Sequence, residues 1–307
     1  MKVSLIGTVL NGAGHVDEFI ASLAAQTVRP DEVVIVDGGS TDGTAERLRV
    51  AEGVTVILEP GANISRGRNL AIAAAAHDVL AVTDVDCILE PDWLQQLLVP
   101  IDDGADVSIG FYAPITDGLL QECLAAVNLP LDASEVDPRR FMPSARSVAF
   151  RRDALEAAGG YPEWLDIGED MWVNHRWREL GLDMRFAPAA LVHWRLRPTL
   201  GGVWLQYFRY ARGDARGGMH PERHALRYGA YAGALLASRS GRRLPALAAL
   251  GAATAYARTP VRRAWRRIDD PGGRAAAMVL VPALMGWIDT AKMAGYAAGL
   301  ADRGRRP

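Results

Sequence analysis

The first hundred residues alternate between short apolar runs and longer segments in which apolar residues recur every three or four positions. The apolar runs, rich in β-branched residues, predict buried strands at Val3–Leu10, Glu32–Val36, Val54–Leu58 and Val79–Thr83. The longer segments predict helices at Val16–Ala25, Thr44–Val50, Ser65–Ala76 and Asp92–Leu98, the second capped by Ser40, Thr41 or Asp42 and the third by Ser65. This alternation indicates an α/β fold, with a mostly parallel sheet covered by helices on both faces.

Polar residues stand at the carboxyl ends of three of these strands, namely Asn11, Asp37 and Asp84. Right-handed crossovers bring the carboxyl ends of parallel strands to one edge of a sheet, so we expect the three residues to be neighbours. That edge is where ligands bind in open α/β sheets. The sequence therefore predicts a ligand site built from distant parts of the chain.

Two acids, Asp84 and Asp86, follow the fourth predicted strand with one residue between them. Two carboxylates at the end of a buried strand are unfavourable unless a cation lies between them. A Mg²⁺-type ion takes one or two carboxylates together with substrate phosphates, so a metal that holds a diphosphate fits this pair. The alternative is a solvated strand end or a helix N-cap, where Asp is also common.

A glycine-rich turn, Asp37–Thr44, joins the second predicted strand to the second helix. Its backbone N–H groups and helix N-terminus suit an anionic ligand. Asp37 could instead accept hydrogen bonds from a base or ribose, and an ordinary loop can have the same composition. The chain contains neither GxxxxGK[ST] nor GxGxxG, so neither a P-loop ATPase nor a nicotinamide-dependent enzyme is expected.

Four segments resemble, in their order and spacing, motifs of the family 2 glycosyltransferases: Val3–Asn11, Asp37–Thr44, Gly61–Asn69 and Asp84–Asp86. The resemblance covers residues 1–220 and implies the GT-A fold, which is Rossmann-like. It also implies a nucleotide-diphosphate sugar as donor, Mg²⁺ or Mn²⁺ as cofactor, and inversion at the anomeric carbon.

The same resemblance assigns roles at the donor site to Thr8, Asn11, Asp37, Arg68, Asp84 and Asp86. Thr8 and Asn11 correspond to positions that line the nucleoside, and Asp37 to the residue that contacts the base. Arg68 corresponds to an arginine near the nucleotide. The last two acids correspond to the metal-binding DxD pair, with Asp86 as the more direct ligand.

In the second half, Gly168–Trp172 matches the family's ED motif, in which the second acid is the catalytic base. Asp170 would then take the proton of the acceptor hydroxyl as the new bond forms, as in inverting glycosidases with water as acceptor. Glu169 is expected to contact the acceptor. An acid pair is also favoured at a helix N-terminus by the macrodipole, and both explanations hold together if Met171–Leu180 is a helix.

Two further segments are candidates for contact with the acceptor, the diphosphate or the metal. The predicted strand Ser144–Phe150 contains Arg146 and Ser147, either of which could touch the acceptor or the diphosphate. His193 ends another predicted strand and, by the resemblance, could approach the metal or the diphosphate. A purely structural role is the alternative for each.

Gln206–Tyr210 is similar to the QxxRW segment of processive polysaccharide synthases, although Tyr210 stands where tryptophan is expected. By this similarity, Arg209 would bind the diphosphate. The alternative is an amphipathic helix whose aromatic residues pack internally or lie at a membrane interface.

The C-terminal part of the chain is basic, whereas the rest is acidic. Residues 223–307 contain 15 Lys+Arg and 4 Asp+Glu, a balance of +11, which leaves −13 for residues 1–222 because the total is −2. Two apolar runs, Leu244–Ala257 and Ala275–Ile288, are each shorter than the ~20 residues of a spanning helix. Arginine clusters flank them: Arg239, Arg242 and Arg243; Arg262, Arg263, Arg266 and Arg267; Arg303, Arg305 and Arg306.

Basic residues beside apolar helices fit the cytoplasmic face of an anionic membrane, so we expect a membrane-associated helical hairpin in this region. A helical extension that packs on the core or on another subunit is the alternative. Nucleic acid is not an expected partner, because the basic residues alternate with apolar runs. Cys87 and Cys123 lack metal or disulfide spacing, which fits a reducing compartment, and no signal peptide is expected.

Together these observations predict a glycosyltransferase domain at residues 1–220 and a basic helical tail at 221–307. Residues 1–105 would bind the nucleotide and residues 106–220 the acceptor, a lipid-linked or glycan hydroxyl. The predicted activity is transfer from a nucleotide-diphosphate sugar in cell-envelope or exopolysaccharide synthesis, at the cytoplasmic side of the membrane. The alternatives are a sugar-phosphate nucleotidyltransferase and a non-catalytic scaffold of a polysaccharide assembly complex.

Overall fold

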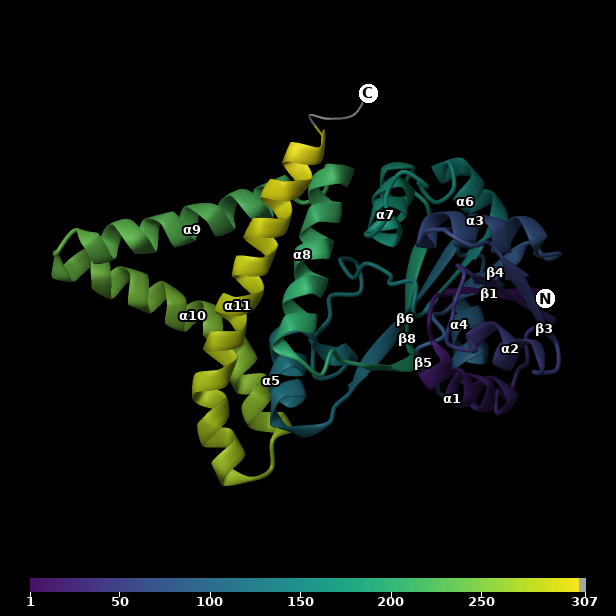
Figure 1. The fold of residues 1–307 in the computed structure, drawn as a ribbon, viewed down its shortest axis with the longest axis horizontal. Coiled ribbons are helices and arrows are strands. Elements are labelled where there is room, and N and C mark those ends of the chain that lie inside the picture. The colour runs from purple at the N-terminus through teal and green to yellow at the C-terminus, as the bar shows by residue number, and fades with distance from the viewer. Residues whose placement is uncertain (304–307) are drawn as a thin grey trace. The chain divides into compact units, whose positions relative to one another are not determined.

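The computed structural model describes residues 1–303 and groups the chain into two compact units (Figure 1). The first comprises Met1–Ile115 and Asp132–Arg195, and the second comprises Thr116–Leu131 and Leu196–Pro307. Residues 196–220 therefore belong to the second unit, while the functional division at residue 220 stays a prediction. Arg305 and Arg306 of the last predicted arginine cluster lie outside the described residues.

The first unit is built on one sheet and the helices that cover it. Its strands are β1 (Val3–Val9), β2 (Glu32–Asp37), β3 (Val54–Leu58), β4 (Val79–Val82), β5 (Cys87–Leu89), β6 (Val107–Ile115), β7 (Val148–Arg151) and β8 (Met184–Arg195). Its helices are α1 (Ala13–Ala24), α2 (Thr44–Arg49), α3 (Ile64–Ala74), α4 (Trp93–Asp102), α6 (Arg152–Ala158) and α7 (Glu169–Glu179), with a short 3₁₀ turn at Ala133–Glu135.

The eight strands form a mixed sheet in the order β3-β2-β1-β4-β7-β6-β8-β5. The first four strands of that order are mutually parallel, while β7 runs antiparallel to β4 and β6, and β5 antiparallel to β8. Val9 pairs with Asp37, so the carboxyl ends of β1 and β2 lie side by side. The parallel half confirms the expected convergence of strand ends at one edge.

Alternating residues of the strands are buried on opposite sides of the sheet. On one side, Ile6 and Val34 join an apolar cluster with residues of α3, α6 and α7, including Trp177. Leu5 and Ile35, which point the other way because side chains alternate along a strand, are also fully buried. Both faces of the sheet are therefore covered, as the sequence predicted.

One helix cap differs from the prediction. Helix α3 begins at Ile64 and is capped by Asn63, whose side chain accepts from the Arg66 N–H, and not by Ser65. Gly43, with φ of 88°, precedes α2, and the carboxylate of Asp42, one of the predicted caps, accepts from the Thr44 N–H at 3.2 Å. Glycine adopts this left-handed conformation without the steric cost of a Cβ, so the turn itself ends the loop.

The second unit is helical: α5 (Gly118–Asn128), α8 (Leu200–Gly217), α9 (Pro221–Arg239), α10 (Arg243–Arg267) and α11 (Pro271–Arg303). Helix α11 packs along α8, and a Cβ at Gly295 or Gly299 would overlap the α8 backbone at Phe208 or Arg212. A second apolar cluster joins α5, α10 and α11.

Both predicted apolar runs are helical, and each lies within a helix longer than the run itself. The runs belong to α10 and α11, helices of 25 and 33 residues, and α11 continues past the charged residues Asp289 and Lys292. Within residues 1–303, α11 is the one helix long and apolar enough to cross a membrane, judged by length and composition.

Candidate active site

The loops after β1 and β2 are tied together at the ligand edge of the sheet. Asn11 adopts the left-handed conformation, with φ of 53°. Its N–H donates to the Ser40 hydroxyl at 2.7 Å, and its side-chain oxygen accepts from the Thr41 N–H at 3.0 Å. These bonds hold the two loops together at the predicted nucleoside site, so Asn11 determines the conformation of the loops.

Asp37 is fully buried at the end of β2. Its Oδ1 accepts from the N–H groups of Gly39 at 2.8 Å and Ser40 at 2.6 Å. Its Oδ2 is buried and accepts no hydrogen bond from a described residue. Since buried polar atoms nearly always have partners, this oxygen is suited to a ligand donor such as a nucleotide base N–H.

Helix α3 lies tightly against β1 at Thr8. A Cβ on Gly67 would come within 2.7 Å of the Thr8 methyl group, so only glycine allows this approach. The next residue, Arg68, is thereby held beside the strand ends. The sequence predicted that Thr8 and Arg68 belong to one site, and the close packing of Gly67 on Thr8 brings α3 against β1 at this point.

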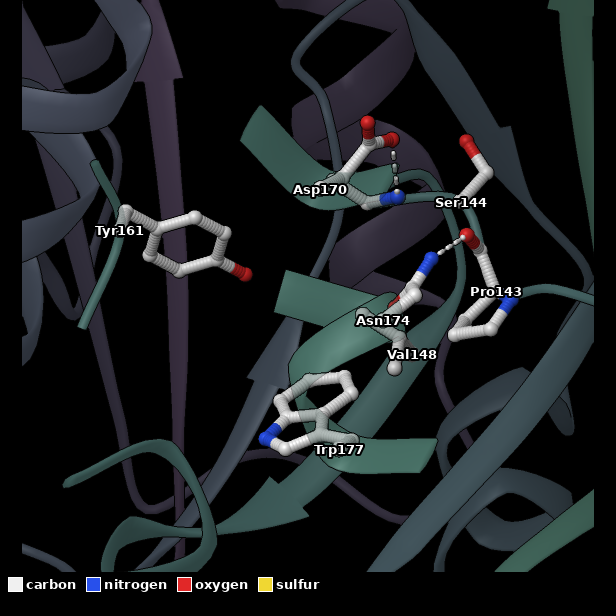
Figure 2. A pocket seen from close by; sticks show the side chains of 8 residues that line it. Pro143, Ser144, Val148, Tyr161, Asp170, Asn174 and Trp177 are labelled. Carbon is white, nitrogen blue, oxygen red and sulfur yellow. Dashed lines mark hydrogen bonds between the residues drawn. The ribbon is translucent and has the colours of Figure 1, made fainter. Parts of the chain in front are cut away.

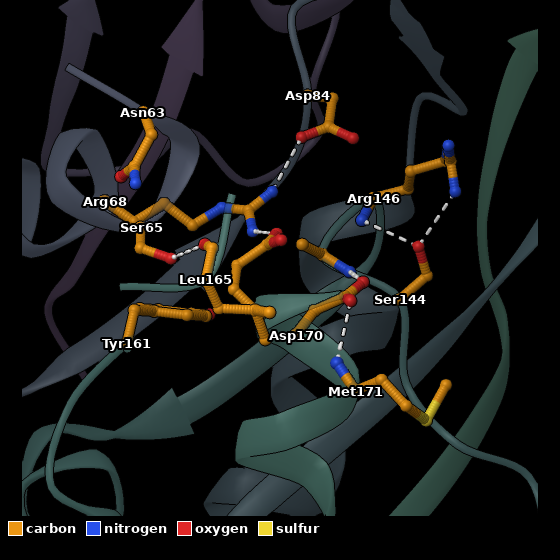
Figure 3. A network of polar contacts seen from close by, with 12 residues as sticks. Asn63, Ser65, Arg68, Asp84, Ser144, Arg146, Tyr161, Leu165, Asp170 and Met171 are labelled. Carbon is orange, nitrogen blue, oxygen red and sulfur yellow. Dashed lines mark hydrogen bonds and ion pairs between the residues drawn. The ribbon is translucent and has the colours of Figure 1, made fainter. Parts of the chain in front are cut away.

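Arg68 connects the two acidic motifs (Figure 3). Its guanidinium is almost completely buried and donates to Asp84 Oδ1 at 3.1 Å and to Glu169 Oε1. It also lies over the Tyr161 ring, 5.4 Å from the ring centre. Asp84 and Glu169 are 85 positions apart in the sequence, and this one side chain brings them together.

The electrostatics of this group follow from its burial. Burial raises the pKa of the Glu169 carboxyl to about 7, with Arg68 opposing the rise and Asp170 adding to it. Burial alone would lower the pKa of Arg68, but Glu169 and Asp84 raise it above its ordinary value, so Arg68 stays charged. The site is thus a buried cation held among three acids.

Asp170 stands next to Glu169 in the first turn of α7 and lines a pocket with Ser144, Tyr161, Asn174 and Trp177 (Figure 2). Its carboxylate accepts from the backbone N–H of Met171 at 2.7 Å and of Ala145 at 3.3 Å. These contacts hold one carboxylate at a partly open position.

Segment 161–165, just before the ED motif, is fastened to α3 by bonds that the sequence analysis did not foresee. Asn69 donates to the Tyr161 carbonyl at 2.9 Å and accepts from its N–H at 3.0 Å. The Ser65 hydroxyl donates to the Leu165 carbonyl at 3.0 Å, which explains why Ser65 does not cap the helix. Ser65 and Asn69 both lie close to Arg68 within Gly61–Asn69, and their position in this motif is the feature of the sequence that could have indicated their role.

Arg146 follows Ala145, whose N–H donates to Asp170, in the loop before β7. Its guanidinium stacks 4.0 Å from the centre of the Trp194 ring and donates to the Ser144 hydroxyl at 3.1 Å. Trp194 pairs with Cys87 across β5 and β8. Burial and the charges of Asp84 and Asp86 raise the pKa of the Cys87 thiol, whereas Arg146 lowers it, so all three charges act on this one position.

The remaining predicted site residues are Ser147, His193 and Arg209. Ser147 is buried, and its hydroxyl accepts from the Trp93 indole at 2.8 Å and donates to the Ala190 carbonyl at 3.0 Å, which fits the structural alternative. His193 Nε2 lies 2.6 Å from a Glu90 carboxylate oxygen. Arg209 is exposed on α8 in the second unit.

The donor set fits a divalent cation that a ligand helps to hold. The four carboxylates of the two motifs, those of Asp84, Asp86, Glu169 and Asp170, outnumber the two arginines Arg68 and Arg146, which favours added positive charge. Arg68 bonds to Oδ1 of Asp84, which leaves Oδ2 on the other side of the carboxylate for a cation. Residues 1–303 contain no cluster of three or more His, Cys, Asp or Glu able to bind a metal alone, so phosphate oxygens would complete the coordination.

The family model for glycosyl transferase family 2 matches residues 4–157, just over half of the chain, so the chain belongs to this family. Glycosyltransferase AglE of Haloferax volcanii is 26% identical over 223 residues, covering 69% of this chain and 72% of the relative. O-antigen chain rhamnosyltransferase RfbN of Salmonella typhimurium is 23% identical, covering 68% and 71%. Succinoglycan biosynthesis protein ExoA of Rhizobium meliloti is 28% identical, covering 67% of each chain.

Solved structures share the fold. Mannosyltransferase PcManGT from Pyrobaculum calidifontis, in complex with GDP-Man and Mn²⁺, has a TM-score of 0.61 and 18% identity, covering 98% of this chain and 88% of its own. GalNAc-T7 with UDP, GalNAc and Mn²⁺ has a TM-score of 0.51 and 18% identity, covering 70% and 47%. The fold is GT-A, as the sequence predicted, and the protein is a glycosyltransferase.

Proposed function

We propose that this glycosyltransferase moves a sugar, with inversion, from a nucleotide-diphosphate sugar to an acceptor hydroxyl. The observation that carries the proposal is Arg68, which joins Asp84 of the DxD pair to Glu169 of the ED motif. In the transfer, the acceptor oxygen bonds to the anomeric carbon and the bond from that carbon to the diphosphate breaks. The acceptor proton passes to a carboxylate, and the nucleoside diphosphate leaves.

On the donor side, Asp37 would accept from the nucleotide base through its buried Oδ2. Asp84 and Asp86 would hold Mg²⁺ or Mn²⁺ together with the phosphate oxygens of the donor. His193 stays a prediction from the resemblance, because its Nε2 faces Glu90 and it forms no three-residue metal cluster with described residues. When bound, such an ion neutralises charge on the leaving diphosphate. Because Arg68 occupies only one oxygen of Asp84, the other can serve this purpose.

Arg146 is the residue we assign to the diphosphate in preference to Ser147. Its guanidinium is presented flat on Trp194, and a planar fork is well suited to phosphate oxygens. It also lies in the same electrostatic neighbourhood as Asp84 and Asp86. A cation at this point would help the diphosphate leave, as preorganised charges do in other transfers. Arg209 remains a second candidate, as predicted from its sequence.

On the acceptor side, Asp170 would be the general base. It lines the pocket, and two backbone N–H groups fix its carboxylate in place. Glu169 is buried against Arg68, which supports a positioning role beside the predicted acceptor contact. The names of RfbN and ExoA, an O-antigen chain rhamnosyltransferase and a succinoglycan biosynthesis protein, support an envelope or exopolysaccharide acceptor. The lipid-linked or glycan nature of that acceptor and the cytoplasmic face of the membrane are our proposals from the sequence.

The Asp170→Asn variant tests this assignment. General base catalysis contributes about 10²–10⁴-fold, so transfer should fall by that factor while donor affinity stays unchanged. The measurement pairs a transfer assay with calorimetric donor binding. Release of a nucleoside diphosphate by the wild type would support glycosyl transfer, whereas release of pyrophosphate would indicate a nucleotidyltransferase. Normal transfer by the variant would remove Asp170 from the mechanism.

A further inference from the structure

Helices α9 and α10 form a hairpin that projects from the rest of the second unit (Figure 1). We call residues 235–250, which surround the turn between the two helices, the hairpin tip. The tip contains five leucines, and all are exposed: Leu235, Leu236, Leu244, Leu247 and Leu250. The relative exposure of Leu244 reaches 81%, and that of Leu236 reaches 70%. Soluble monomers rarely expose apolar side chains in such a group, so the tip calls for a partner.

The charge of the hairpin identifies the kind of partner. From residue 223 to residue 268 there are ten arginines and no acid: Arg223, Arg227, Arg239, Arg242, Arg243, Arg258, Arg262, Arg263, Arg266 and Arg267. The three arginines of the tip make no ion pair with a described residue. Leucines beside arginines without acids fit an anionic lipid surface, which accepts both. Two copies of the tip would repel each other.

Helix α11, which best matches a membrane span by composition, packs against other helices of the second unit. Helix α11 buries Val281, Leu284 and Met285 in the apolar cluster with α5 and α10, and Gly295 and Gly299 against α8. Neither α9 nor α10 meets the criterion for a span, yet their leucines are exposed. Composition therefore favours α11 as the element that contacts a membrane, whereas the exposed leucines favour α9 and α10.

We infer that the hairpin tip docks on an anionic membrane, with its leucines in the interface and Arg239, Arg242 and Arg243 at the lipid headgroups. This inference deepens the proposed membrane location by naming the element that makes contact. It also changes the predicted hairpin, because the two exposed arms are α9 and α10, whereas the sequence suggested α10 and α11.

A fluorescent label distinguishes the two elements. The native Cys87 and Cys123 are buried, so a nitrobenzoxadiazole label would react with a cysteine introduced by Leu247→Cys, in the tip, or by Val279→Cys, in α11. Both positions are exposed, at 62% and 72%. With vesicles of equal parts phosphatidylcholine and phosphatidylglycerol, emission should shift to the blue at position 247 and stay unchanged at position 279.

Co-sedimentation of the full chain with the same vesicles separates the contribution of the leucines to binding from that of the arginines. The Leu244→Ser/Leu247→Ser/Leu250→Ser variant should lose binding, and Val50→Ser, at an 85% exposed site in the first unit, should not. The Arg239→Ala/Arg242→Ala/Arg243→Ala variant should bind on the order of a hundredfold more weakly at low salt, from about 1 kcal/mol per arginine. Its binding to phosphatidylcholine alone should not change.

A blue shift at position 279 without one at 247 would overturn the inference in favour of α11. No shift at either position would also overturn it, and a dimer lost in the leucine variant would then identify a second copy as the partner. Donor calorimetry on the leucine variant keeps the two proposals apart. If no protein bound any donor, the proposed function would fail while the vesicle result stood.

Discussion

At the scale of single residues, the candidate site depends on Arg68. A buried ion pair contributes little net stability when intact, but removal of one partner leaves an uncompensated charge. Without Arg68, the uncompensated charge would be that of Glu169. This carboxylate is buried, and the charge of the adjacent Asp170 acts on it. Arg68 thus determines both the shape of the site and the state of its acids.

Arg68→Met should lower the free energy of unfolding by about 3–5 kcal/mol at neutral pH, because Glu169 loses its counter-ion. Arg66→Met is the matched control two residues earlier. Arg66 pairs with Glu59 at 2.6 Å, but it is half exposed, so this change should cost less than about 1 kcal/mol. Denaturant unfolding measures both, and equal losses would contradict the central position of Arg68.

The pKa of Glu169 gives a prediction with a defined sign. The folded-state pKa is raised to about 7 from an unfolded value of 4.5. Between these values the folded state binds more protons than the unfolded state, so stability falls as pH rises through the window. Unfolding free energies of the wild type and Glu169→Gln should therefore diverge across this pH range, with a steeper decline in the wild type. Parallel curves would refute the raised pKa.

Arg146 separates diphosphate binding from nucleoside binding. Arg146→Ala should weaken nucleoside diphosphate binding about tenfold or more, the value of a charge-assisted hydrogen bond, and leave nucleoside monophosphate binding unchanged. Arg146→Lys should restore part of the loss, because lysine keeps the charge without the planar fork. Calorimetry with both ligands decides; an equal loss for both would show that Arg146 merely supports the fold.

At the scale of elements, the first half of the sheet could be read from the sequence, because period-two runs and helical spacing agree with tertiary packing there. β3 is an example, with Val54–Leu58 predicted and observed. The region around β7 was harder, since the strand begins only at Val148 and the preceding residues form the site loop. Tertiary contacts, such as that of Ser65 with Leu165, also overrode local capping preference.

Gly110 shows how closely the elements approach in the second half of the sheet. A Cβ there would overlap the Ser147 hydroxyl and press on the Ala190 carbonyl at 2.6 Å. Gly110→Ala should therefore cost about 1–3 kcal/mol, as overpacking does. Gly14→Ala, in α1 with nothing within 4 Å, should instead gain about 0.5–1 kcal/mol. Thermal unfolding of both variants checks this, and a neutral Gly110→Ala would contradict the described packing.

At the scale of the whole molecule, the sequence separated an acidic part from a basic part, and the structure divides the chain into two compact units. The residues of the candidate site other than the predicted Arg209 lie in the first unit, and its acids were all predicted from motifs. The linking roles of Arg68, Asn69 and Ser65 were not predicted, because hydrogen bonds across 92 to 101 positions leave no pattern in one sequence. Likewise, the sequence does not distinguish the exposed leucines of α9 and α10 from the apolar residues of α11 that pack internally.

The most direct test of the central claim is calorimetric titration of wild type and Asp86→Ala with UDP, GDP and dTDP sugars, with and without Mn²⁺. We expect the wild type to bind one donor class, only with metal, and the variant to lose this binding. A donor bound equally well by both proteins, or without metal, would contradict the assignment of Asp84 and Asp86 to the metal-diphosphate site.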